Sequence, residues 1–119
     1  MIKFESVKEF DKEFKKIRKK YPSLDADFEN FKKILLTILP DELPTKFPET
    51  YLISGLKSKI KTPAYIVKQF RCKALGGGGR SGIRITYAFD ETKYTFIEIY
   101  HKNKKPIGHK NRILKYFKE

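Results

Sequence analysis

Residues 82–102, GIRITYAFDETKYTFIEIYHK, decide the fold of this chain. Apolar and polar side chains alternate on both sides of a polar turn at 90–93, and alternation with a period of two predicts β-strands. We therefore predict strands over 82–90 and 94–102, joined as an antiparallel hairpin. A further alternating stretch predicts a strand over 64–74, which a glycine-rich loop separates from the hairpin.

Upstream of this region, the apolar residues recur with helical spacing. The first set is Val7, Phe10, Phe14, Ile17 and Tyr21, and the second is Leu24, Phe28, Phe31, Leu35 and Ile38. Spacings of three and four residues place each set on one face of a helix. Pro22 ends the first helix. Ser6 and Glu9 predict a capping box at its start, in which each side chain bonds to the backbone amide of the other residue.

Shorter segments complete the predicted order of elements. Residues 2–4 predict a first strand and 109–118 a last helix, whereas 40–63 carry four of the six prolines and predict an irregular connection. The order β-α-α-β-β-β-α favours one α+β domain over 1–119. Its simplest packing is an antiparallel sheet with the N-terminal α-helical hairpin on one face.

The chain is strongly basic, and the excess charge is unevenly placed. Its 119 residues carry 27 Lys and Arg against 14 Asp and Glu, a formal net charge of +13. Residues 1–60 hold 13 basic and 10 acidic side chains, whereas 61–119 hold 14 basic and 4 acidic ones. An excess of this size predicts a polyanionic partner, which binds mainly to the second half of the chain.

Several classes of protein are excluded by composition. Cys72 is the only cysteine, so a disulfide framework and a cysteine-rich zinc site are excluded. His101 and His109 are the only histidines, which argues against a multi-histidine metal centre, and we expect no cofactor. The longest apolar run, 34–39, is too short to span a bilayer, and the N-terminus has no apolar signal segment. We therefore expect a cytoplasmic protein with no membrane partner.

Alternation also predicts which side chains lie on the face of the sheet away from the helices. That face is expected to gather Arg71, Lys73, Arg84, Glu98, Tyr100 and Lys102, with Tyr65, Val67, Tyr94 and Phe96 beside them. Ile66, Phe70, Ile83, Ile85, Tyr87, Ile97, Ile99 and His101 are expected to meet the helices. Lys68 falls on the helix side in this scheme, so either it reaches out from an edge or a bulge shifts the register.

A cluster of cations and aromatic rings on rigid strands suits RNA. Arginine binds phosphate oxygens with two hydrogen bonds, and rings such as Phe96 and Tyr100 stack on unpaired bases. Cleavage of RNA requires a base for the 2′-hydroxyl, cations for the charge on the transition state, and an acid for the leaving 5′-oxygen. The side chains that could carry these protons are Glu98, Tyr100, His101, His109 and a lysine.

Three stretches of the chain resemble a known family. They are Lys68-Gln69-Phe70-Arg71-Cys72-Lys73, Arg80-Ser81-Gly82-Ile83-Arg84-Ile85-Thr86-Tyr87 and Phe96-Ile97-Glu98-Ile99-Tyr100-His101-Lys102. Together with the helical start and the turn at 53–56, they resemble a RelE/ParE-type toxin of a type II toxin–antitoxin system. The resemblance covers essentially the whole chain. It implies a RelE-like α+β fold, an endoribonuclease that cuts mRNA, often on the ribosome, and a small antitoxin, commonly acidic.

The resemblance also implies roles for individual residues. The residues matched to catalysis are Arg71, Arg84, His101 and Lys102, and those matched to RNA binding are Lys68, Lys73, Arg80, Tyr100 and His109. Arg84 ends the Gly-x-Arg segment, whose arginine contacts phosphate at the cut site in RelE-like members. Glu49 is a weak match to a glutamate that serves some members before the sheet. No metal is implied.

Other interpretations stay open at this stage. A ParE-like inhibitor of DNA gyrase and a basic RNA-binding module without catalysis are the alternative functions. Arg84 is also explained as an ordinary exposed strand residue, and His101 as a histidine packed beneath the sheet. The lysines of the first helix are those of a solvated helix face, and the glycine-rich loop lacks the lysine of a phosphate-binding loop.

Overall fold

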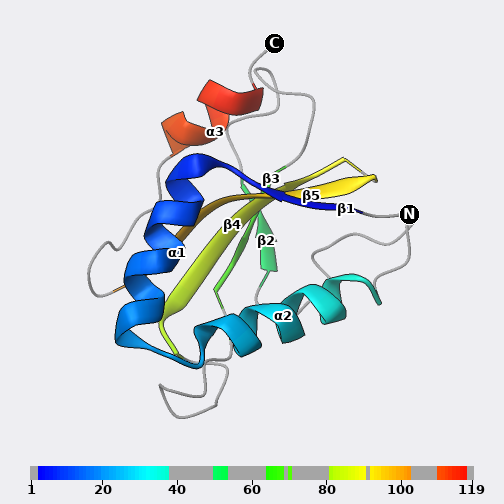
Figure 1. The fold of residues 1–119 in the computed structure, drawn as a ribbon. Helices are drawn as coiled ribbons and strands as arrows, with labels where there is room; N and C mark the ends of the chain where they lie inside the picture. The colour runs from blue at the N-terminus through cyan, green and yellow to red at the C-terminus, as the bar shows by residue number, and fades with distance from the viewer. Residues whose placement is uncertain are drawn as a thin grey trace.

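A computed structural model describes residues 3–37, 50–53, 64–68, 70, 81–90, 92–102 and 110–117 of the chain. Its elements are β1 (Lys3–Ser6), α1 (Lys8–Lys20), α2 (Leu24–Leu35), β2 (Thr50–Leu52), β3 (Ala64–Val67), β4 (Ile83–Phe89), β5 (Lys93–His101) and α3 (Lys110–Phe117). The protein belongs to the α+β class. Figure 1 shows α1 and α2 on one side of the sheet and α3 on the other.

The β4–β5 hairpin forms the centre of the sheet, as the alternating stretch predicts. The strand order is β1-β5-β4-β3-β2, and β4 pairs antiparallel with both β5 and β3. The predicted strands at 82–90 and 94–102 and the helices before them are confirmed. The strand predicted over 64–74 is observed at Ala64–Val67, and 71–74 and the loop at 76–79 lie outside the described residues.

The prediction of an all-antiparallel sheet is wrong in one pairing, and one strand was missed. β1 pairs parallel with β5, with Lys3 opposite Lys93 and Ser6 opposite Phe96. Most of the chain separates these two strands, so no short turn constrains their relative direction. Within the stretch predicted as irregular, β2 pairs antiparallel with β3 at the edge of the sheet. This strand was not predicted, because three residues are too few to show a period.

The predicted capping box at the start of α1 is not formed. Ser6 belongs to β1, so the N-cap position falls to Val7, which makes no side-chain cap bond. The Ser6 hydroxyl donates instead to Asp11 Oδ1 at 2.6 Å. Glu9 accepts hydrogen bonds from Lys115 Nζ at 3.0 Å and from the Tyr116 hydroxyl, so it links α1 to α3.

A β-bulge at Ile97 changes which residues of β5 face the core. Thr86 pairs with Glu98 and the next residue, Tyr87, pairs with Phe96, which leaves Ile97 as the extra residue. One extra residue inverts the alternation beyond it. Phe96 therefore faces the helical hairpin, contrary to the prediction, and is 2% exposed. Its ring centroid lies 4.8 Å from that of Phe28, on α2.

The predicted orientation of the side chains is confirmed in β4 and wrong in β3. In β4, the side chains that join the core beneath α1 and α2 are those predicted, Ile83, Ile85, Tyr87 and Phe89. In β3, Tyr65 and Val67 face this core in place of Ile66, so that part of the prediction is inverted. Phe70 also reaches the core, which breaks the alternation between Val67 and Phe70. Lys68 is exposed, which agrees with either explanation offered for it, a reach out from an edge or a shift in register.

The third helix packs on the opposite face of the sheet through a smaller apolar cluster. Ile113 of α3 contacts Ala64, Ala88 and Ile97, which come from β3, β4 and β5. Ile97 is the extra residue of the bulge. The bulge therefore places Ile97 on the side of α3 and Phe96 on the side of α1 and α2. The sheet therefore packs against α1 and α2 on one face and against α3 on the other.

Candidate nucleic-acid site

The candidate site lies on the α3 side of the sheet, where Arg84 is half-buried and Glu98 and Tyr100 are buried. Arg84 of β4 and Tyr100 of β5 lie directly opposite each other in the register, and Glu98 lies opposite Thr86 one step further along this face. Residues opposite each other on neighbouring strands have Cβ atoms about 5 Å apart. The hairpin therefore brings together a guanidinium, a phenol and a carboxylate, as the alternation predicted for these residues.

Local contacts fix the start of β4, which carries Arg84. The Ser81 hydroxyl donates to the Phe70 carbonyl at 2.5 Å and accepts from the Ile83 N–H at 3.1 Å. Lys102 N–H donates to the Gly82 carbonyl at 2.9 Å, which extends the pairing by one residue. Arg84, the second residue of β4, follows directly after these contacts, and its side chain is half-buried.

Tyr100 lies in an environment that keeps its phenol protonated. Burial raises the pKa of Tyr100 above its ordinary value of 10.0, the Arg84 guanidinium opposes the rise, and the Glu98 carboxylate adds to it. Tyr100 is 5% exposed, so its ring offers little surface for stacking on a base. At neutral pH this phenol can donate a proton or a hydrogen bond.

Glu98 is the buried carboxylate of the site, with 1% of its surface exposed. Its charge acts on Tyr100, as above, and also on Arg112 of α3. The pKa of Arg112 is raised chiefly by its hydrogen bond to Glu13, with a smaller contribution from Glu98.

Two lysines lie exposed at the margin of the site. Lys68 directly follows β3, and continuing the β3–β4 register by one residue places it beside Arg84. Lys102 directly follows β5, two residues after Tyr100, so the alternation of the strand places it on the same face as Tyr100. These positions give the site an exposed cationic border next to the half-buried guanidinium.

His101 does not join this group directly. His101 pairs with Ile83, which faces α1 and α2, so His101 lies on the opposite face of the sheet from Arg84 and Tyr100. Its side chain is partly exposed. Gly82 has a φ of +86°, and a Cβ at that position would lie 2.8 Å from His101 Nε2. The imidazole therefore packs against a backbone position that only glycine leaves open.

The remaining predicted site residues are not placed by the structure. Arg71, Lys73, Arg80, His109 and Glu49 lie outside the described residues. Within the described residues, no group of three or more His, Cys, Asp or Glu side chains is arranged to hold a metal ion. The site as described thus consists of Arg84, Glu98 and Tyr100, bordered by Lys68 and Lys102.

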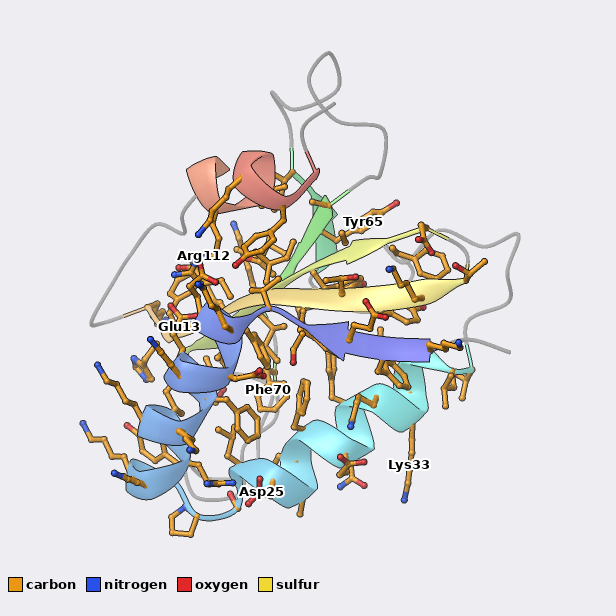
Figure 2. All side chains as sticks on the ribbon, turned by 45° about the horizontal axis from the view of Figure 1, so that its top comes forward. Glu13, Asp25, Lys33, Tyr65, Phe70 and Arg112 are labelled. Carbon is orange, nitrogen blue, oxygen red and sulfur yellow. The ribbon has the colours of Figure 1, made fainter. Side chains whose placement is uncertain are left out.

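An ion pair between α1 and α3, which no pattern in the sequence indicates, supports this part of β5. Arg112 Nη1 and Nη2 donate to the two carboxylate oxygens of Glu13 at 2.8 and 3.0 Å, and Nη1 also donates to the Ile97 carbonyl at 3.0 Å. The Ile99 N–H donates to Glu13 Oε1 at 3.3 Å. Figure 2 shows Glu13 and Arg112 approaching each other from α1 and α3. Together the two side chains bond to the Ile97 carbonyl and the Ile99 N–H on the edge of β5, beyond the last residue of β1.

Comparison of the chain with protein-family models, with curated proteins and with solved structures found no match. The likeness to RelE/ParE-type toxins therefore rests on the sequence motifs alone. No helix in the described parts of the chain is long and apolar enough to cross a membrane.

Proposed function

We propose that this protein is a RelE-like toxin of a type II toxin–antitoxin system, an endoribonuclease that cuts mRNA and thereby stops translation. The observation that carries the proposal is the pairing of the half-buried Arg84 with Tyr100, beside Glu98 and bordered by the exposed Lys68 and Lys102. The RelE/ParE-type motifs match Arg84 to the contact with phosphate at the cut site and Tyr100 to RNA binding, and the Arg84 guanidinium supplies positive charge that RNA cleavage requires.

In the proposed reaction, the 2′-hydroxyl of the RNA loses its proton and its oxygen attacks the adjacent phosphorus. The bond from phosphorus to the 5′-oxygen then breaks, and that oxygen takes up a proton. Arg84 binds the phosphate and stabilises the extra negative charge that develops on it. His101, which is partly exposed, is the proton-transfer group that the resemblance implies. Glu98 and Tyr100 are 1% and 5% exposed, so they act on Arg84 from beneath the surface and do not touch the RNA.

The exposed lysines bind the substrate outside the reacting phosphate. Lys68 and Lys102 border the site and contact neighbouring phosphates as point charges. Arg71, Lys73, Arg80, His101 and His109 retain the roles that the family resemblance implies. A small acidic antitoxin that covers these cations would block RNA binding, in the cytoplasm where both proteins meet the ribosome.

Induced expression in bacteria tests the proposal against its alternatives. We expect growth arrest, new mRNA 5′ ends and relief of both by Arg84→Ala in a protein that still folds. A gyrase inhibitor would instead linearise plasmid DNA through gyrase and leave mRNA 5′ ends unchanged. A non-catalytic RNA-binding module would bind RNA with a steep salt dependence and create no new ends.

A further inference from the structure

The helical side of the protein carries a groove whose chemistry differs from that of the rest of the molecule. It lies between α1, α2 and β1, has a volume of about 320 Å³, and is separated by the sheet from the candidate RNA site. Figure 2 shows α1 and α2 diverging from the turn near Asp25, with β1 above them. The groove belongs to no part of the proposed cleavage reaction.

The inside of the groove is aromatic. Phe10 and Phe96 are buried at its floor, and Phe4, Phe14 and Phe28 are half-buried at its sides. Neighbouring rings lie with centroids 5.2 Å apart for Phe14 and Phe28 and 5.9 Å apart for Phe4 and Phe96. Such rings present apolar surface and negatively polarised faces to any group that enters.

The rim of the groove is acidic, although the chain as a whole carries +13. Its lining includes four carboxylates, of Glu5, Asp11, Asp25 and Glu29, and one ammonium group, of Lys32. Glu5 also pairs with Lys93, which does not line the groove, at 3.2 Å. The side chains of Asp25 and Glu29 are each 61% exposed despite ion pairs with Arg18 and Lys32. Exposed ion pairs are weak, so these carboxylates can exchange their partners for those of a ligand.

Lys32 shows how the groove recognises a cation. Its Nζ lies 5.6 Å from the ring centroid of Phe4 and 5.2 Å from that of Phe28. The same ammonium group lies 2.7 Å from Glu29 Oε1. An ammonium group in this groove thus contacts aromatic faces and a carboxylate at once, which is a favourable combination for lysine and arginine.

The edge of the sheet indicates that the occupant is an extended peptide. Among the described strands, β1 ends the sheet, and its only strand partner there is β5. Phe4, Glu5 and Ser6 of β1 also line the groove. The free edge of a strand can pair with an added extended segment, whose alternate side chains then reach the surface beside it.

We infer that this groove binds an extended basic segment of a partner protein, in which an apolar side chain enters between the phenylalanines and flanking lysine or arginine residues meet the acidic rim. Carboxylates on all three surrounding elements favour several cations over one. The negative rim in a basic protein also disfavours binding of the RNA that the opposite face is proposed to take.

Binding of labelled peptides by the full chain tests this inference, with fluorescence anisotropy as the readout. A peptide of repeating Lys-Leu should bind more tightly than one of repeating Lys-Ser, which has the same charge without the apolar side chains. Asp25→Asn with Glu29→Gln should weaken Lys-Leu binding by roughly 2- to 30-fold, the product of two exposed charge pairs. Both side chains are exposed, so the fold should be kept.

A matched control separates the groove from general repulsion. Ala26→Lys with Asn30→Lys changes the net charge by the same amount on exposed positions of α2 that do not line the groove, and should weaken binding less. Equal weakening by both pairs of substitutions would overturn the inference. Equal binding of the Lys-Leu and Lys-Ser peptides, or competition by spermidine as strong as by Lys-Leu, would also overturn it. None of these outcomes depends on whether the protein cleaves RNA.

Discussion

Replacing Arg112 with methionine should weaken the attachment of α3 to the rest of the fold and lower the stability of the protein. Arg112 donates to both carboxylate oxygens of Glu13, at 2.8 and 3.0 Å, and to the Ile97 carbonyl at 3.0 Å. The two side chains are 14% and 23% exposed. Methionine keeps an unbranched apolar stem of similar size but removes all three hydrogen bonds. Glu13 then loses its main counter-charge.

The expected cost follows from this geometry. Removing one partner of a buried ion pair destabilises a protein by about 3–5 kcal/mol, whereas an exposed pair contributes about 0–1 kcal/mol. The Glu13–Arg112 pair is bidentate and mostly buried but retains some contact with solvent. We therefore expect Arg112→Met to lower the free energy of unfolding by about 2–3 kcal/mol.

Urea unfolding at pH 7, followed by circular dichroism, measures this change. Arg18→Met is the matched control, because Arg18 lies 3.5 Å from Asp25 in a pair that is 43% and 61% exposed. It should cost no more than about 1 kcal/mol. Combining Arg112→Met with Glu13→Gln should cost less than the sum of the two changes by at least about 1 kcal/mol. Equal losses for Arg112→Met and Arg18→Met, or strictly additive losses in the double variant, would refute the reasoning.

Substitutions at Phe96, Gly82 with His101, and Glu9 test other parts of the structure by urea unfolding. Phe96→Ala should cost about 3–5 kcal/mol because the bulge turns this ring into the core, and a cost below about 0.5 kcal/mol would mean that the ring faces solvent. Gly82→Ala should cost about 1–3 kcal/mol because of its positive φ, and a further His101→Ala should recover only the part due to the clash. Glu9 has a pKa lowered from 4.5 to about 2, first by its hydrogen bond from Tyr116 and then by that from Lys115. Its contribution to stability is therefore complete above about pH 4.5 and lost as the pH falls through about 2, so Glu9→Gln should destabilise the protein at pH 7 and match the wild type near pH 2.

Local periodicity was sufficient to predict the hairpin strands and both N-terminal helices. The spacing of Phe10 and Phe14, and the alternation of Ile83 and Ile85, depend only on neighbouring residues. The placement of Arg84 and Tyr100 on the same face of the sheet followed from the same alternation, whereas their direct pairing is seen only in the structure. The face that carries the candidate site could therefore be predicted from the sequence.

The features that the sequence did not predict depend on contacts between distant segments. The bulge at Ile97 leaves no mark on the alternation of β5 itself, because apolar residues occupy both faces around it. The parallel pairing of β1 with β5 and the Glu13–Arg112 pair join residues separated by most of the chain. Ser6 could have capped α1, but its pairing with Phe96 held it in a strand instead.

The most direct test of the proposed function is RNA cleavage by the purified protein, with and without ribosomes, measured for the wild type, Arg84→Ala and Arg18→Ala. Arg18 is an exposed arginine on the helical side of the molecule, so its replacement controls for loss of positive charge. We expect the wild type and Arg18→Ala to cleave at similar rates and Arg84→Ala to be at least about 100-fold slower while still folded, the effect of removing one group that stabilises a transition state. Cleavage by folded Arg84→Ala at the wild-type rate, or no cleavage by the wild type under either condition, would contradict the account.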